Sequence, residues 1–249
     1  MSERSRYRAE LAYVGTDFHG WQRQRNADRT VQALLEQALA KFARAPVVAV
    51  AAGRTDAGVH ADGQVVHFDL QSPREADRIR TAVNSLLPWD AKLLSVAPAG
   101  PGFHARRDAL WKEYLYRWSR ADVIPPRDAL FVSRISPAAD PDLMAAVIAD
   151  LPGTRDFAVF ASRHPAGEPT VRTLHAAAVE QAGDEIRLLL RGDGFLRGMV
   201  RAIAGVLADL GRGAVPPGRL AELLRSGDRR LLRPKAAARG LTLRRVHYG

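Results

Sequence analysis

The residues best suited to chemistry in this sequence lie in one short segment, residues 53–58, which reads Gly-Arg-Thr-Asp-Ala-Gly. Its carboxylate, Asp56, is two residues from the guanidinium of Arg54, and a glycine stands at each end. Glycines permit tight turns and close approaches, and loops held by a rigid sheet often carry catalytic groups. An ionised carboxylate there can act as a nucleophile or a general base. The alternative is an ordinary turn with a weak surface ion pair.

Apolar runs on both sides of this segment indicate the elements that hold it. Residues 47–52 read Val-Val-Ala-Val-Ala-Ala and predict one strand; residues 64–68 read Gln-Val-Val-His-Phe and predict another. A short glycine-containing turn is expected between His60 and the second run. Asp56 would then lie on a loop between two strands.

The rest of the N-terminal half has a strand at 7–13, where apolar and mostly polar residues alternate. Thr30 can cap a helix whose apolar positions continue to Phe42 at helical spacing. Ile79 and Val83 mark a second helix, which ends before Pro88, and residues 93–97 predict a further short strand.

The C-terminal half follows the same style. An aromatic-rich strand is predicted at 112–119, a helix opening at Asp140-Pro141, a hairpin joining 172–181 to 185–191, a helix at 195–210 and a last strand at 241–246. Strand-rich halves with two helices each predict an α+β fold with the helices on one face of the sheet. We divide the chain into an N-terminal half, 1–107, and a C-terminal half, 108–249.

The predicted helix at 195–210 has two different sides. Met199 and Ile203 should face the core, and Arg201 points well away from them at about 100° per residue. Glycines on the side of Arg201 would let another backbone or a ligand come close. Otherwise Arg201 simply reaches from the helix flank to solvent. On the strand at 112–119, Tyr114 and Tyr116 share one face, where core packing is the ordinary role.

Composition restricts the function classes. The chain has 249 residues, with 37 basic against 27 acidic side chains and a net charge of +10. A basic surface attracts a polyanion such as RNA, but it also aids solubility. All but four of the basic residues are arginine, which suits phosphates and base edges but also fits a GC-rich genome or heat adaptation. The absence of cysteine excludes disulfides and thiolate metal sites. With no apolar run long enough for a membrane and no signal-like N-terminus, we expect a cytoplasmic protein.

Several blocks together resemble the tRNA pseudouridine synthase A family. Besides the segment at 53–58, the matching blocks read Tyr-Val-Gly-Thr-Asp-Phe-His-Gly-Trp-Gln-Arg-Gln (13–24), Asn-Ser-Leu-Leu-Pro (84–88), Phe-His-Ala-Arg (103–106), Lys-Glu-Tyr-Leu-Tyr (112–116), Phe-Leu-Arg-Gly-Met-Val-Arg (195–201) and Gly-Leu-Thr-Leu (240–243). They occur in the order of the family and span nearly the whole chain.

The resemblance implies two similar α/β halves that share a largely antiparallel sheet and enclose a central catalytic cleft. It implies isomerisation of uridine to pseudouridine at tRNA positions 38, 39 and 40, in the anticodon stem-loop, by a homodimer that needs no cofactor. Asp56 would be the catalytic carboxylate. It could attack C1′ of the ribose, attack C6 of the uracil, or remove the C2′ proton, and the sequence leaves these three routes open.

The same resemblance assigns partners to Asp56. It implies that Tyr114 contacts the target uracil, that Leu241 forms an apolar wall of the pocket, and that Arg201 forms an ion pair with Asp56. A uridine in a stem-loop must leave its stack to be reached, and Arg54 could fill the vacated space or bond loop carbonyls instead. Weaker candidates for phosphate contacts are Arg23, Arg25, Arg106 and Arg107.

Two rival interpretations belong to other classes. A metal-dependent hydrolase could use the cluster Asp56, His60, Asp62, His67 and Asp69, although these residues meet no recognised ligand pattern. A catalytically inactive RNA-binding module would keep the charge and the aromatic residues without the reaction. The joint presence of Asp56, Arg54, Tyr114 and Arg201 favours the enzyme.

Overall fold

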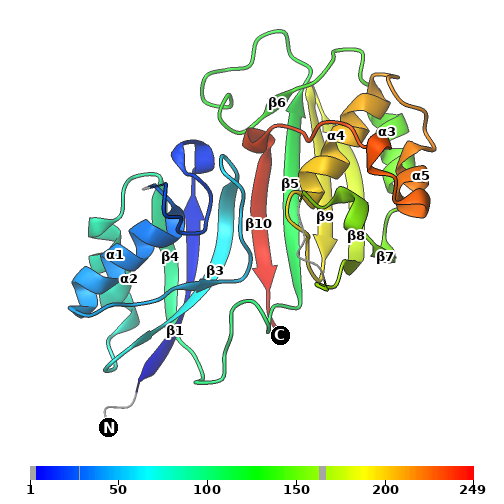
Figure 1. The fold of residues 1–249 in the computed structure, drawn as a ribbon. Helices are drawn as coiled ribbons and strands as arrows, with labels where there is room; N and C mark the ends of the chain where they lie inside the picture. The colour runs from blue at the N-terminus through cyan, green and yellow to red at the C-terminus, as the bar shows by residue number, and fades with distance from the viewer. Residues whose placement is uncertain (1–3, 28, 163–166) are drawn as a thin grey trace. The chain divides into compact units, whose positions relative to one another are not determined.

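The structure is a computed structural model that describes residues 4–27, 29–162 and 167–249. It divides into two compact units, Met1–Leu110 with Leu243–Gly249, and Trp111–Thr242. Each unit combines a largely antiparallel sheet with helices, which confirms the predicted α+β class (Figure 1). No helix in the described ranges is both long and apolar enough to span a membrane.

The sheet of the first unit is centred on β1 (Ser5–Tyr13). It pairs antiparallel with β3 (His60–Leu70) on one side and with β4 (Ala91–Pro98) on the other. Every second residue of β1 from Tyr7 to Tyr13 is buried, as the alternation predicted. A two-residue strand, β2 (Val50–Ala51), pairs with β3.

Two helices cover one face of this sheet. The first, α1 (Val31–Ala43), begins at Thr30, whose Oγ1 accepts a hydrogen bond from the amide of Ala33 at 3.3 Å, so the predicted cap is confirmed. The second, α2 (Ala76–Leu86), buries Ile79 and Val83 completely. It packs on β4 and against α1, and Figure 1 shows the two helices side by side.

The strand prediction for residues 47–52 was largely wrong, because only Val50 and Ala51 pair with a neighbouring strand. The backbone of Ala49 bonds to side chains of α1 instead. Its amide donates to Oε1 of Glu36 at 3.0 Å, and its carbonyl accepts from Nε2 of Gln32 at 3.3 Å. Val48 is consequently 63% exposed.

The turn predicted after His60 was also wrong, because β3 already begins at His60. Gly63 continues the strand where its neighbours approach closely: a Cβ there would lie 2.8 Å from the carbonyl oxygen of Arg244 and 2.9 Å from Oε1 of Glu10. Here the glycine serves a close approach within the sheet rather than a turn.

In the second unit the strands run in the order β5 (Trp111–Ser119), β9 (Glu185–Gly192), β8 (Val171–Ala182) and β7 (Gly153–Asp156), each antiparallel to the next. The short β6 (Ser133–Arg134) pairs parallel to β5. The predicted hairpin is confirmed, since Ala182 pairs with Glu185 across a turn in which Gly183 has φ 59°.

Three helices lie in the described part of this unit: α3 (Pro141–Ile148) packs on β8, α4 (Met199–Gly211) packs on β5, and α5 (Arg219–Ser226) packs on α4. The helix predicted to open at Asp140-Pro141 begins at Pro141, and Asp140 caps it, accepting from the amides of Asp142 and Leu143 at 3.0 Å. The helix predicted at 195–210 starts later, at Met199, because Gly198 takes a left-handed conformation (φ 74°) at its N-cap. Figure 1 shows α4 in front of β9.

Single 3-10 turns complete the fold: η1 (Gly15–Asp17), η2 (Ala158–Phe160), η3 (Arg229–Leu231) and η4 (Ala238–Gly240). The last strand, β10 (Leu241–His247), matches the prediction for 241–246. Its first two residues belong to the second unit and the others to the first.

Candidate active site

Asp56 lies on a loop between β2 and β3 and is half-buried, whereas Arg54 is exposed and Thr55 is buried between them. The amide of Val59 donates to the carbonyl oxygen of Asp56 at 3.2 Å, and Gly58 within that turn has φ 77°. The glycine is required there because other residues rarely adopt a positive φ. The turn prediction for this segment is therefore confirmed, and it presents a carboxylate that is neither deeply buried nor freely solvated.

The backbone of this loop is bound to a segment far away in the sequence, residues 15–21. The amide of Trp21 donates to the carbonyl oxygen of Thr55 at 3.1 Å. In the other direction, the amide of Gly58 donates to the carbonyl oxygen of Phe18 at 3.2 Å. Gly20 has φ 86°, and a Cβ there would lie 2.7 Å from the Thr55 carbonyl oxygen. The opening block of the family resemblance thus serves, in this chain, to hold the Asp56 loop.

Side chains from two strands support the loop from the interior. The hydroxyl oxygen of Tyr13 lies 2.9 Å from Oγ1 of Thr55, and Nε2 of Gln64 donates to the carbonyl oxygen of Gly53 at 2.8 Å. The same nitrogen lies 3.4 Å from the Tyr13 hydroxyl. Sequence reasoning missed this role of Tyr13 and Gln64, because spacing along the chain does not reveal hydrogen bonds between distant strands.

Three members of the rival metal cluster take part in hydrogen bonds that maintain the fold. Nδ1 of His60 accepts from the amide of Gly15 at 3.0 Å, and Nδ1 of His67 accepts from the amide of Ala105 at 3.1 Å. Both carboxylate oxygens of Asp69 are bonded by Arg6, at 2.7 and 2.8 Å, which lowers the pKa of Asp69. Among the described residues, no group of three or more His, Asp or Glu side chains could hold a metal ion.

In the second unit, Tyr114 lies buried on β5 with its ring edge-on to Phe195, 4.9 Å between centroids and 76° between planes. Tyr116, two residues on, is fully buried, and its hydroxyl donates to the carbonyl oxygen of Ala237 at 2.9 Å. The prediction that the two tyrosines share one face of the strand agrees with this arrangement. Phe195 itself precedes α4 instead of lying on it.

Arg201, on the first turn of α4, is held by residues 234–236. Its Nε donates to the carbonyl oxygen of Ala236 at 2.8 Å, and the amide of Ala236 donates back to the carbonyl oxygen of Arg201 at 2.9 Å. Gly205, one turn further along, is where the backbone of Pro234 and Ala236 approaches too closely for a Cβ. The close approach predicted from the glycines on this side is confirmed, and the approaching group is this chain's own backbone.

The same segment leads to Leu241, a buried residue that begins β10. Gly240 is in close contact with the ring of Tyr116, since a Cβ there would be 2.6 Å from Cζ. Residues 234–241 therefore bond to α4 at Arg201 and to β5 at Tyr116 before they reach Leu241. Arg54 and Asp56 therefore lie in the first unit. Tyr114, Arg201 and Leu241 lie in the second. That the two sets meet in one cleft stays a prediction.

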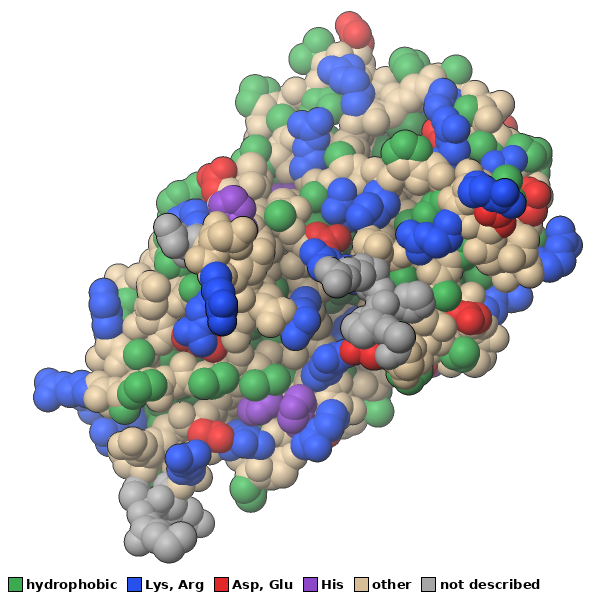
Figure 2. Space-filling view, in the orientation of Figure 1, with side chains coloured by type: hydrophobic (Ala, Val, Ile, Leu, Met, Phe, Trp, Pro, Cys, Tyr) green, Lys and Arg blue, Asp and Glu red, His purple; other side chains and the backbone are tan. Residues whose placement is uncertain are grey.

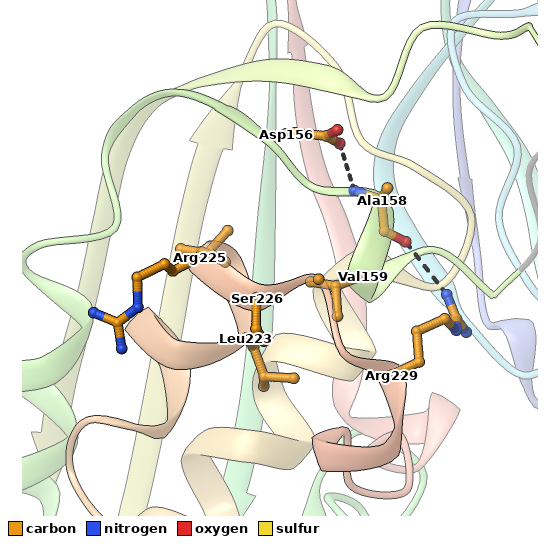
Figure 3. A pocket seen from close by; sticks show the side chains of 9 residues that line it. Asp156, Ala158, Val159, Leu223, Arg225, Ser226 and Arg229 are labelled. Carbon is orange, nitrogen blue, oxygen red and sulfur yellow. Dashed lines mark hydrogen bonds between the residues drawn. The ribbon is translucent and has the colours of Figure 1, made fainter.

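A pocket in the second unit involves none of the predicted site residues (Figure 3). Residues around α5 and η2 line it, among them Asp156, Arg225 and Arg229. Oδ1 of Asp156 accepts from the amide of Ala158 at 2.9 Å, and Nη1 of Arg229 donates to the carbonyl oxygen of Ala158 at 3.3 Å. The charged groups drawn with dashed lines in Figure 3 thus bond to backbone of the unit itself.

Basic side chains are distributed over the visible face of each unit, with acidic ones among them (Figure 2). Several arginines are paired with carboxylates, such as Arg117 with Glu185 at 2.6 Å and Arg191 with Glu113 at 2.8 Å. On this face the basic side chains are dispersed, so the charge excess does not by itself mark a site.

Comparison with known proteins identifies the family. A profile described as tRNA pseudouridine synthase matches residues 9–108 and 147–249. A tRNA pseudouridine synthase A from Methylobacterium nodulans is 41% identical over 244 residues, which cover 98% of this chain and 96% of that protein. One from Brevibacillus brevis is 39% identical over 243 residues, covering 98% and 99%.

Among solved structures, a chain of a Cbf5-Nop10-Gar1 complex has a TM-score of 0.33 and 14% identity over 81% of this chain and 45% of that one, a likeness too low to carry an argument. The sequence matches extend through both units and include the Asp56 loop, α4 and β10. The chain therefore belongs to the tRNA pseudouridine synthase A family of uridine isomerases.

Proposed function

We propose that this chain converts uridines 38, 39 and 40 of the tRNA anticodon stem-loop to pseudouridine, with Asp56 as the catalytic carboxylate. The observation that carries the proposal is the fixed, half-buried position of Asp56 on a glycine turn whose backbone is bonded to residues 15–21. A carboxylate that must meet one sugar or base atom needs a position fixed in advance.

The reaction breaks the bond between N1 of uracil and C1′, rotates the base, and joins C5 to C1′; C5 loses its hydrogen as a proton, and N1 takes up a proton. Atoms and electrons balance without an oxidant, reductant or group donor. Asp56 can start it by attacking C1′, by attacking C6, or by removing the C2′ proton. All three routes require an ionised carboxylate that the substrate can reach, which agrees with its partial exposure.

We assign substrate contacts in the second unit to Tyr114 and Leu241. Tyr114 would contact the target uracil, and its ring is already oriented by the edge-on contact with Phe195. Leu241 would supply an apolar wall. An aromatic and an aliphatic side chain are the kinds of residue that predominantly line small-molecule pockets.

Arg201 would form an ion pair with Asp56, which favours the charged carboxylate. Its hydrogen bond to Ala236 supports this role, because it orients the guanidinium before substrate arrives.

The target base must leave its stack to reach the site, and we propose that Arg54 occupies the vacated space. Its side chain is exposed and only two residues from Asp56. A guanidinium plane can stack on the neighbouring bases, which offsets part of the cost of extrusion.

We also propose that two copies of the chain act together on one tRNA in the cytoplasm, where tRNA is modified. Sedimentation of the protein with and without tRNA tests this, since the proposal predicts two protein copies for each tRNA.

The test of substrate and position uses anticodon stem-loop RNAs that carry a single uridine at position 38, 39 or 40, and control RNAs with that uridine moved into the upper stem. Carbodiimide modification followed by primer extension locates pseudouridine. We expect conversion in the first set alone. Binding of all the RNAs with no pseudouridine in any of them would favour the RNA-binding module instead.

A further inference from the structure

A buried polar network lies directly beneath the Asp56 loop, within the first unit. It consists of Tyr13 on β1, Gln64 on β3, and the loop atoms that they contact, Oγ1 of Thr55 and the carbonyl oxygen of Gly53. Gln64 is completely buried and Tyr13 is 4% exposed. Polar groups at such depth are costly unless bonded. Nε2 of Gln64 and the hydroxyl of Tyr13 are bonded, whereas Oε1 of Gln64 has no hydrogen-bond partner among the described residues.

The hydrogen bonds made by Gln64 have a direction that follows from the groups present. Nε2 of Gln64 can only donate, and it donates to the carbonyl oxygen of Gly53 and toward the hydroxyl oxygen of Tyr13. That hydroxyl and Oγ1 of Thr55 lie 2.9 Å apart, and either oxygen can be the donor. The hydrogen bonds therefore connect Gln64 through Tyr13 to the residue next to Asp56.

The network contacts the loop on both sides of Arg54, at Gly53 and at Thr55. The backbone bonds described above hold the loop from the other direction, through Trp21 and Phe18. Rotation of the peptide units that carry Asp56 would break bonds on both sides of the loop.

We propose that Tyr13 and Gln64 are positioning residues for catalysis: their hydrogen bonds to Thr55 and Gly53 fix the orientation of the Asp56 carboxylate. This inference rests on the proposed function of Asp56. Neither residue has to touch the substrate, and the effect of each is exerted through the loop. A displacement of about 1 Å in a reacting group can reduce a rate about a hundredfold, so loss of one such hydrogen bond should be visible in turnover.

The chain provides a matched control in Tyr7, on the same strand and 2% exposed. Its hydroxyl is also fully used, donating to the carbonyl oxygen of Arg74 at 2.7 Å and accepting from the amide of Arg74 at 2.6 Å. Arg74 precedes α2 and has no contact with the Asp56 loop in any hydrogen bond described for it. Tyr7→Phe and Tyr13→Phe thus each remove one buried, bonded hydroxyl from β1.

The experiment compares wild type, Tyr13→Phe and Tyr7→Phe by single-turnover tritium release from tRNA labelled at uracil C5, together with the Kd for tRNA and the Tm. We expect Tyr13→Phe to lower the rate about tenfold or more with its Kd within about twofold of wild type. The Tm of Tyr7→Phe should fall by about as much as that of Tyr13→Phe, while its rate stays within about twofold of wild type. Equal rates for the two variants would overturn the proposal.

A second pair of variants covers the case in which Tyr13→Phe does not fold. Thr55→Val keeps the shape of the side chain but loses Oγ1, whereas Thr55→Ser keeps the oxygen that Tyr13 contacts. We expect Thr55→Val to be slowed about tenfold and Thr55→Ser to recover most of that rate at unchanged tRNA affinity. If Thr55→Val and Thr55→Ser turn over equally, the hydroxyl contact has no positioning role and the proposal fails.

Asp56→Asn, measured in parallel, separates failure of the proposed function from failure of the positioning role alone. No release by wild type, or full release by Asp56→Asn, would overturn the proposed function and the positioning role with it. Release that depends on Asp56 but not on Tyr13 or Thr55 would overturn the positioning role alone.

Discussion

The carbonyl oxygen of Thr55 accepts a hydrogen bond from the backbone amide of Trp21 at 3.1 Å, which joins two segments more than thirty residues apart in the sequence. Between them Gly20, with φ 86°, leaves no space for a side chain against the loop. The residue next to the proposed catalytic carboxylate is therefore fixed by backbone as well as by the hydroxyl of Tyr13. Trp21 and Tyr13 carry no reacting group, yet their hydrogen bonds to Thr55 hold the loop that presents Asp56.

Gly20→Ala should reduce both stability and turnover. The substitution adds about 1 kcal/mol for a positive φ, and it forces the backbone of residues 55–57 to move, because the new Cβ would lie 2.7 Å from the Thr55 carbonyl oxygen. We expect a loss of about 2 kcal/mol or more in the free energy of unfolding and at least a tenfold lower rate. Urea denaturation and tritium release measure the two effects.

Gly183→Ala is the control for this substitution. Gly183 also has a positive φ, 59°, but no described atom lies within 4 Å of a Cβ placed there. It should show the conformational cost of about 1 kcal/mol without any loss of turnover. Turnover lost equally in both variants would show that the contact between Gly20 and the loop is not the cause.

Tyr13 should make the protein sensitive to alkali. Burial raises the pKa of Tyr13 to about 12, and the hydrogen bonds to Thr55 and Gln64 lower it only in part. Since the unfolded-state pKa is about 10, this contribution to stability is complete below pH 10 and is lost as the pH rises toward 12. The loss from Tyr13 amounts to about 3 kcal/mol at full ionisation.

The measurement is urea denaturation of wild type and Tyr13→Phe at a series of pH values from 9 to 12. The wild type should lose stability more steeply than the variant across this window. Burial also raises the pKa of Tyr116, which adds a loss of the same sign to both proteins. Parallel curves for the two proteins would contradict a buried, protonated Tyr13.

Arg201→Lys should lower turnover about tenfold or more, although the charge is kept. Lysine cannot reproduce the planar guanidinium whose Nε donates to the carbonyl oxygen of Ala236 at 2.8 Å, so the cation would lose its orientation. Single-turnover rates and tRNA affinity should be measured together, because we expect the rate to change much more than the Kd.

The control for Arg201→Lys is Arg212→Lys at the other end of α4. Arg212 is 46% exposed and pairs with Asp209 at 2.8 Å, a surface ion pair whose replacement should be nearly neutral. Equal rates for Arg201→Lys and Arg212→Lys would contradict the need for an oriented guanidinium at residue 201.

Local signals in the sequence were sufficient where one segment determines its own structure. The cap at Thr30, the alternation of β1 and the hairpin turn at Gly183 were all predicted correctly, because each depends on residues within a few positions. The start of α4 was predicted too early, since the apolar spacing from Phe195 continues through Gly198, whose left-handed backbone cannot continue a helix.

Tertiary contacts explain the remaining differences. The apolar run at 47–52 has the composition of a strand, but Glu36 and Gln32 of α1 bond the backbone of Ala49 in place of a neighbouring strand. In the candidate site, Asp56 was predicted from its glycine loop and the family resemblance, and its catalytic role stays a prediction. The support from Tyr13 and Gln64 was not predicted, because no pattern within one strand indicates which loop a buried hydroxyl or amide will contact.

We propose that Asp56 carries out the isomerisation, and tritium release from tRNA labelled at uracil C5 measures that reaction itself. Asp56→Asn keeps the size of the side chain and removes its ability to act as a base or an anionic nucleophile. We predict that wild type releases tritium while Asp56→Asn binds tRNA with similar affinity and releases none. Release by Asp56→Asn at the wild-type rate would show that Asp56 is not the catalytic carboxylate.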